Sequence, residues 1–288
     1  MLTSPAMPSQ PLRRPAVAGS WYPGSPQALT AAVDRYVAGV KEVPRGTVTG
    51  LVSPHAGLMY SGPVAAHAYA AAASGSYDVA VLVGPSHHVG FDGVAVFARG
   101  AFDTPLGPME VAEADAAAIL RHTPVARENP AAHAREHSLE MQLPFLARLL
   151  PATPIVPLVM GYQTRETIRA LADGLGQALA GRRALLIASS DLSHYQDARA
   201  AKQLDGEVLQ AVADFDADAL LSLLERYPEH ACGGGPMVAV MRAARLLGAS
   251  DARVLKYADS GDVSGDKSAV VGYMAAVFGR FERDGTRG

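Results

Sequence analysis

Along the chain, short runs of continuously apolar residues alternate with longer segments in which apolar residues recur at helical spacing. The short runs are rich in β-branched residues, which is typical of strands, whereas the longer segments are rich in alanine and leucine. The predicted strands cover residues 48–53, 79–84, 94–98, 155–160, 184–189, 253–258 and 269–278. A capped helix is predicted to begin after Ser25, and further helices cover residues 63–73, 113–121, 138–150, 165–180, 198–213, 217–226 and 236–247.

Two of the predicted strands, VAVLVG at 79–84 and ALLIAS at 184–189, are almost entirely apolar. Such strands are buried on both faces, which indicates parallel central strands between two layers of helices. The pattern therefore predicts an α/β three-layer sandwich with a central, mostly parallel mixed sheet, and antiparallel pairing near 94–98 and at the C-terminal strand. We expect a single domain over residues 13–280, with flexible segments at 1–12 and 281–288.

The composition narrows the class of protein. Of 288 residues, 49% are hydrophobic and 18% are charged, so a large core can form and general disorder is excluded. The net charge of −3 removes the general electrostatic argument for binding nucleic acid. Because no apolar run is long enough to span a membrane and the N-terminus carries no apolar signal segment, we expect a cytoplasmic protein with no nucleic-acid or membrane partner.

Polar side chains follow three of the predicted strands at the point where each strand ends. His55 follows the strand at 48–53, His87 and His88 follow 79–84, and Asp191 and His194 follow 184–189. The carboxyl ends of parallel strands meet at one edge of a sheet, so these groups are expected to converge there. We favour His87 over His88 as the residue facing the cleft, since it is nearer the strand end. Imidazoles in this arrangement suit zinc, iron or copper, and their spacing does not choose among these metals.

Asp191 and His194 are three residues apart and would share a helix face if a helix begins there. The pair could orient a metal ligand or act as acid and base, or Asp191 could simply cap the helix. His137 stands at the start of the predicted helix 138–150, where a charged imidazole opposes the helix dipole, so a neutral His137 is expected.

Cys232 is the only cysteine in the chain, against nine histidines, so an internal disulfide is excluded. It precedes three glycines and the predicted helix 236–247. A helix N-terminus favours the thiolate, and the glycines permit close approach of the backbone to a ligand or to another segment. The alternative is a buried, inert cysteine beside a flexible turn.

Several motifs occur in order and together resemble the Memo family, whose prokaryotic members are also called the B protein of the AmmeMemoRadiSam system. The resemblance covers about residues 13–278. Its motifs are Pro54-His55-Ala56-Gly57, Gly84-Pro85-Ser86-His87-His88, Glu136-His137-Ser138-Leu139-Glu140, Ser189-Ser190-Asp191-x-x-His194 and Cys232-Gly233-x-x-Pro236. Gln142 departs from the pattern, because some eukaryotic members carry histidine at this place.

The resemblance implies a fold similar to that of class III extradiol dioxygenases, which hold non-haem Fe(II). By this resemblance His55 and His87 would be metal ligands, and Cys232 would stand where those dioxygenases place a carboxylate. Asp191, His194 and His137 would line the same pocket and provide acid–base functions.

Three functions are consistent with these residues and with the resemblance. The first is a redox enzyme with iron as the expected metal, copper or zinc as alternatives, and an unspecified small-molecule substrate. The second is a non-catalytic metal- or partner-binding protein that acts with a radical-SAM enzyme and an AMMECR-type protein. The third is a zinc hydrolase using His55, His87, Asp191 and His194, which leaves Cys232 without a role.

Overall fold

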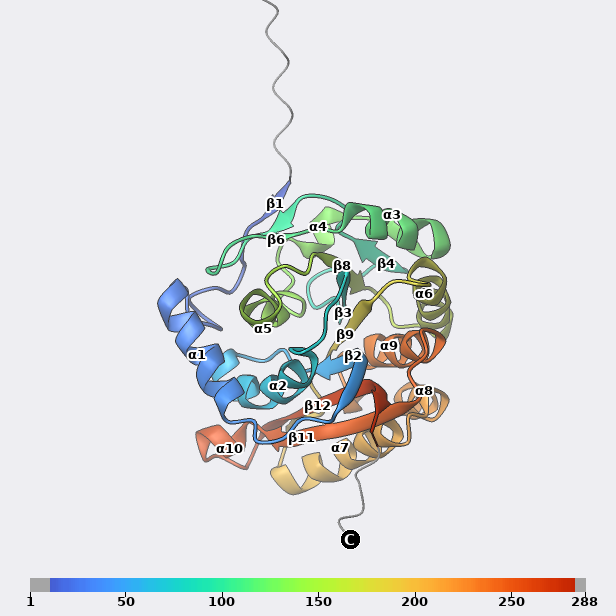
Figure 1. Cartoon of the computed structure of the whole chain (residues 1–288). Helices are drawn as coiled ribbons and strands as arrows, with labels where there is room; N and C mark the ends of the chain where they lie inside the picture. Colours follow the sequence, from blue (N-terminus) through green and yellow to red (C-terminus); the bar gives the residue numbers. More distant parts are fainter. Residues whose placement is uncertain (1–10, 283–288) are drawn as a thin grey trace, which may run out of the picture.

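The computed structural model describes residues 11–282, in which helices cover both faces of a large sheet (Figure 1). Within these residues the main sheet has nine strands. Eight of them lie in the order β10 (His194–Gln196), β12 (Val270–Phe281), β2 (Gly46–Ser53), β9 (Ala184–Ser189), β3 (Val79–Pro85), β8 (Ile155–Met160), β4 (Val94–Val96) and β7 (Ala126–Glu128). The ninth, β11 (Asp251–Asp259), pairs with β12.

The four central strands, β2, β9, β3 and β8, are parallel to their neighbours within this group. Every residue of β3, β8 and β9 is buried, which explains why their sequences are continuously apolar. The outer strands turn antiparallel where β4 pairs with β8 and where β12 pairs with β2. The predicted mostly parallel mixed sheet is therefore confirmed.

Two layers of helices bury these strands. One face carries α1 (Pro26–Ala38), α2 (Leu58–Ala72) and α5 (Leu143–Leu149). The opposite face carries α3 (Glu113–His122), α6 (Arg165–Ala178), α7 (Ala198–Ala213), α8 (Ala217–Arg226) and α9 (Gly234–Leu246). The result is the three-layer sandwich that the sequence predicts.

The remaining elements are short. A small sheet is formed by β1 (Leu12–Arg13), β5 (Ala101–Phe102) and β6 (Met109–Glu110). Connecting turns contain α4 (Pro130–His133), α10 (Gly261–Ser264) and the 3₁₀ helices η1 (Glu140–Gln142) and η2 (Pro228–His230). Of the segments expected to be flexible, residues 1–10 and 283–288 lie outside the described residues, whereas Leu12 and Phe281 belong to strands.

Two local predictions are wrong. The helix expected at 138–150 starts as η1 and becomes α-helical only at Leu143, since Pro144 suits the first turn, where its missing N–H is not needed. The helix expected from residue 63 begins at Leu58, with Pro63 inside it. The sequence leaves open whether a helix begins directly after β9, and none does: residues 190–193 form an irregular segment that leads into β10, so Asp191 and His194 do not share a helix face.

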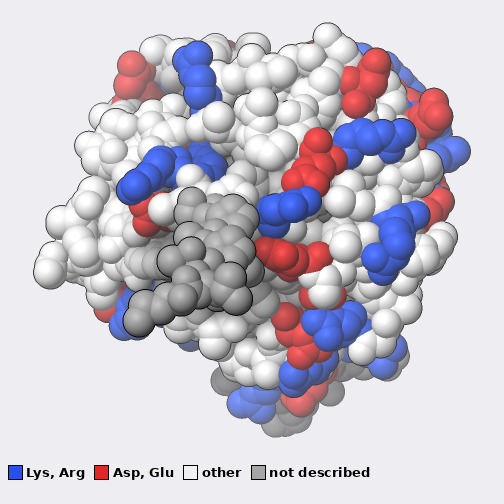
Figure 2. Space-filling model, turned by 90° about the horizontal axis from the view of Figure 1, so that it is seen from above, with Lys and Arg blue, Asp and Glu red and all other residues white. Residues whose placement is uncertain are grey.

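No helix among the described residues is long and apolar enough to cross a membrane. Figure 2 shows acidic and basic side chains interspersed on the face seen from above. That distribution agrees with the small net charge of −3.

Candidate metal centre

The order of the central strands positions the candidate ligands. β9 lies between β2 and β3, and all three are parallel, so their carboxyl ends share one edge of the sheet. His55 follows β2, Asp191 follows β9 and His87 follows β3. Loops that are far apart in sequence therefore meet at this edge, as the strand pattern predicts.

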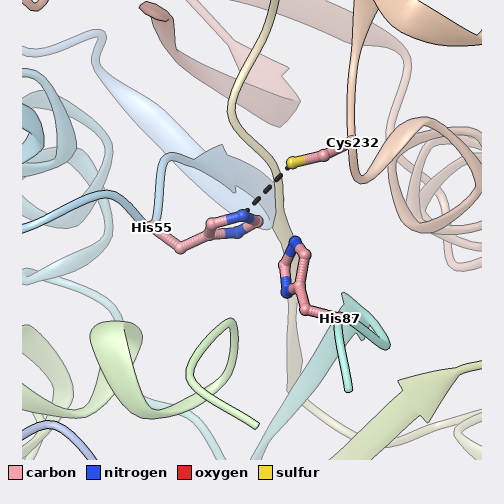
Figure 3. A group of neighbouring side chains, drawn as sticks. All are labelled: His55, His87 and Cys232. Atoms are coloured by element: carbon pink, nitrogen blue, oxygen red, sulfur yellow. Dashed lines mark hydrogen bonds between the residues drawn. The ribbon is translucent and has the colours of Figure 1, made fainter. Parts of the chain in front are cut away.

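His55, His87 and Cys232 point toward a common centre (Figure 3). One ligand atom from each lies within 4.8 Å of the other two. His55 Nε2 is 3.2 Å from Cys232 Sγ, and the centroids of the two imidazole rings are 5.2 Å apart. Two imidazoles and a thiol sulfur form a donor set that suits iron, copper or zinc.

Glycine holds Cys232 close to the end of β9. A Cβ atom built on Gly233 would lie 2.2 Å from the carbonyl oxygen of Ser189, so only glycine fits without movement of the backbone. The Gly233 N–H also donates to Ser190 Oγ over 2.9 Å. On the other side, Gln163 Nε2 donates to the carbonyl oxygen of Cys232 over 2.7 Å. The sulfur is thus positioned by contacts on both sides of its loop.

Alanine at Gly233 is expected to lower the free energy of unfolding by about 1–3 kcal/mol, because the added methyl group overlaps backbone. Gly206→Ala, in α7, is the matched control, since a Cβ atom added there meets nothing within 4 Å and alanine favours a helix. Urea unfolding followed by circular dichroism compares the two. Equal stability of both variants would contradict the close packing of the Cys232 loop.

Glu136 orients His87. Its carboxylate accepts from the His87 ring at Nδ1 over 2.9 Å and from the His87 backbone N–H over 2.6 Å. The Ser138 N–H donates to the same carboxylate over 2.9 Å. Burial raises the pKa of Glu136, but the hydrogen bonds from His87 and Ser138 outweigh it and hold the pKa well below its usual range. The sequence pattern alone assigns no role to Glu136.

Asp191 contacts the backbone that carries His55. Its Oδ1 accepts from the N–H groups of His55 and Ala56 over 2.7 and 3.3 Å. Its Oδ2 lies 4.0 Å from His55 Nε2. Burial raises the pKa of Asp191 to about 7, although the two backbone hydrogen bonds oppose this shift. Asp191 thus lies beside the three candidate ligands without a helix to present it.

His137 lies beside His87 and His55. Its ring stacks on the His87 ring, with centroids 4.5 Å apart at an angle of 20°, and the Trp21 ring lies 4.5 Å away. Burial, followed by the proximity of His87, lowers the pKa of His137 to about 4, so the ring is neutral near pH 7 as expected. Trp21, which the sequence pattern does not assign to the site, is 39% exposed and packs against His137.

His194 is half-buried on β10 and is not in the cluster of three ligand atoms. It lines a cavity of about 200 Å³ together with Ser193 and Cys232. Burial lowers the pKa of His194. His88, disfavoured from the sequence, is exposed, and its ring centroid lies 5.9 Å from that of His137.

The environment of Cys232 differs from the one expected at a helix N-terminus. Burial, and then the adjacent Asp191 carboxyl, raise the pKa of the Cys232 thiol above its ordinary value. The expected stabilisation of the thiolate by α9 does not overcome these effects. The thiol therefore keeps its proton, and a bound cation would have to displace it.

The fold and the site together define a three-layer α/β protein with a candidate His₂Cys metal centre. The model of the family described as "Memo-like protein" matches residues 13–277. A MEMO1 family protein of Methanopyrus kandleri, MK0963, is 39% identical over 280 residues, which is 93% of this chain and 99% of that protein. A MEMO1 family protein of Methanosarcina mazei is 42% identical over 271 residues, covering 92% of this chain and 98% of its own length. The chain belongs to the Memo-like family, as its motifs predict.

Among solved structures, the uncharacterized protein JW3007 from Escherichia coli K12 has a TM-score of 0.45 and 17% sequence identity to this chain. The match covers 71% of this chain and 86% of that one.

Proposed function

We propose that this protein binds a redox-active metal at His55, His87 and Cys232 and uses dioxygen as the oxidant of a small molecule there. Iron is the first choice of metal and copper the second. The observation that carries the proposal is the mutual approach of the three ligand atoms within 4.8 Å. A second support is the shared edge of β2, β9 and β3, where α/β proteins bind their ligands.

A metal ion held by two imidazoles and a thiolate supplies redox chemistry and polarisation of a bound substrate at its open coordination positions. The protein side chains perform the remaining steps. Glu136 holds the His87 ring, and Asp191 holds the His55 backbone. We assign proton transfer with the substrate to Asp191 and to the neutral His137 ring, which lie beside His55 and His87.

Cys232→Ser tests the ligand set. We expect anaerobically purified wild-type protein to contain stoichiometric iron or copper with a sulfur-to-metal absorption band, and the serine variant to lose the band and much of the metal. Elemental analysis and absorption spectroscopy measure both. A zinc-filled wild type whose hydrolytic activity survives Cys232→Ser would contradict the proposal and support a zinc hydrolase.

Oxygen consumption separates turnover from simple binding. The metal-loaded protein is mixed with a panel of catechols, and dissolved oxygen and products are followed, with His55→Ala as the metal-free control. Metal-dependent products support an oxidase or dioxygenase. Tight metal binding without any oxygen consumption would contradict the redox activity and favour a non-catalytic protein that acts with a radical-SAM enzyme and an AMMECR-type protein.

A further inference from the structure

A buried chain of hydrogen bonds runs from α2 to the ring of His55. The Tyr69 hydroxyl donates to Gln142 Oε1 over 2.9 Å, and Gln142 Nε2 donates to Ser189 Oγ over 2.9 Å. Ser189 Oγ in turn lies 2.8 Å from His55 Nδ1. Tyr69, Gln142 and Ser189 are all fully buried, so water does not compete for these contacts.

The direction of each hydrogen bond follows from groups that can only accept. Gln142 Nε2 lies 3.1 Å from the carbonyl oxygen of Pro54, so the amide nitrogen must face that side and Oε1 must face Tyr69. Ser189 Oγ lies 2.7 Å from the carbonyl oxygen of Ser138, which takes the only proton of the hydroxyl. Ser189 is then left as an acceptor toward His55.

This assignment determines the tautomer of His55. Because Ser189 Oγ accepts, His55 Nδ1 must carry the ring proton and Nε2 must present its lone pair. Nε2 is the atom that lies 3.2 Å from Cys232 Sγ, at the candidate metal position. His87 is fixed in the same tautomer by a different group, since its Nδ1 faces the Glu136 carboxylate.

We propose that Ser189 and Gln142 are positioning residues that hold His55 with its proton on Nδ1 and its Nε2 lone pair directed at a metal. The role in metal binding rests on the proposed function, whereas the tautomer itself does not. Gln142 acts on His55 through Ser189. Its role here is defined, because its amide donates to Ser189 and keeps that hydroxyl an acceptor.

The tautomer is tested in the metal-free protein by nitrogen NMR of histidine labelled with ¹⁵N in the ring, with His55 assigned by its absence in His55→Ala. We expect wild-type His55 to be protonated on Nδ1. Ser189→Ala, which removes the acceptor, is expected to move the proton to Nε2, and Gln142→Leu to give a mixture. Protonation of wild-type His55 on Nε2, or unchanged spectra in both variants, would overturn the proposal.

Titration with Co(II) then tests the consequence for metal binding. We expect Ser189→Ala and Gln142→Leu to bind Co(II) about 10-fold more weakly or worse, the size usual for removal of a partner of a metal-bound histidine. Tyr69→Phe, a milder change, is compared with Tyr22→Phe, which removes a buried phenol hydrogen bond to Glu140 instead. Only Tyr69→Phe should weaken Co(II) binding. Equal effects of the two Tyr→Phe variants would contradict a chain of hydrogen bonds from Tyr69 to His55.

The NMR measurement of the tautomer and the Co(II) titration distinguish failure of the proposed function from failure of the positioning role. A wild type with His55 protonated on Nδ1 that binds no metal would overturn the proposed function and support the tautomer assignment. Variants that shift the tautomer without any change in Co(II) affinity would overturn the positioning role.

Discussion

Replacement of Glu136 by glutamine is expected to weaken metal binding by about 10- to 100-fold. The carboxylate accepts three hydrogen bonds, two from His87 and one from Ser138, and it donates none. Glutamine has one acceptor oxygen, so its NH₂ group must face at least one of these donors. In either orientation of the amide, the His87 ring loses the negative charge that strengthens it as a ligand, and at least one of the hydrogen bonds that hold the His87 segment is lost.

The measurement is a Co(II) or Fe(II) titration of the Glu136→Gln protein under anaerobic conditions. Glu128→Gln serves as the matched control, because Glu128 pairs with the exposed Arg99 on the surface. The control should bind metal as the wild type does. An affinity unchanged in Glu136→Gln would show that His87 does not bind the metal, or that its ring needs no partner.

The sheet and the meeting of His55, His87 and Asp191 could be predicted because they depend on patterns that are local in sequence. Each of the three strands is short and strongly apolar, and each ends directly before its polar residues. Parallel pairing then brings the strand ends together, whatever the length of the connections between them.

The side chains that hydrogen-bond to the candidate metal ligands could not be predicted from local patterns. Glu136 contacts His87 across 49 positions, and Ser189 contacts His55 across 134. Glu136 lies in a segment without helix or strand, where no periodicity indicates which way a side chain points. The irregular path of residues 190–193 is likewise determined by tertiary contacts, since the Leu192 N–H donates to the carbonyl oxygen of Gly272 and the Gly272 N–H donates to that of Ser193.

Cys232 shows most clearly that tertiary contacts can change what a local sequence pattern indicates. Its position before a glycine-rich turn and a helix is visible in the sequence, and that position favours the thiolate while leaving a buried, inert cysteine as the alternative. Burial and the Asp191 carboxyl instead raise the pKa of the Cys232 thiol. These effects come from residues on other elements, so a local pattern cannot report them.

Glu140→Ala is expected to lower the free energy of unfolding by about 3–5 kcal/mol, the range for breaking a buried ion pair from one side. Glu140 is fully buried and pairs with the buried Arg13. It also accepts from the N–H groups of Ala16 and Val17 over 2.8 and 3.0 Å, and from the Tyr22 hydroxyl over 2.7 Å. Alanine would leave these donors without their acceptor and the buried Arg13 charge without its carboxylate partner.

Because the same carboxylate accepts hydrogen bonds from Ala16, Val17 and Tyr22, next to Trp21, the variant should also alter the contact between Trp21 and His137. Trp21 is the only tryptophan, so its fluorescence reports on this segment, while circular dichroism during urea unfolding reports on the whole fold. Arg148→Ala breaks the exposed pair with Asp34 and should change stability by no more than about 1 kcal/mol. The Glu140→Ala protein could instead be as stable as Arg148→Ala, with unchanged Trp21 fluorescence. That result would show that residues 16–22 are held by their apolar contacts alone.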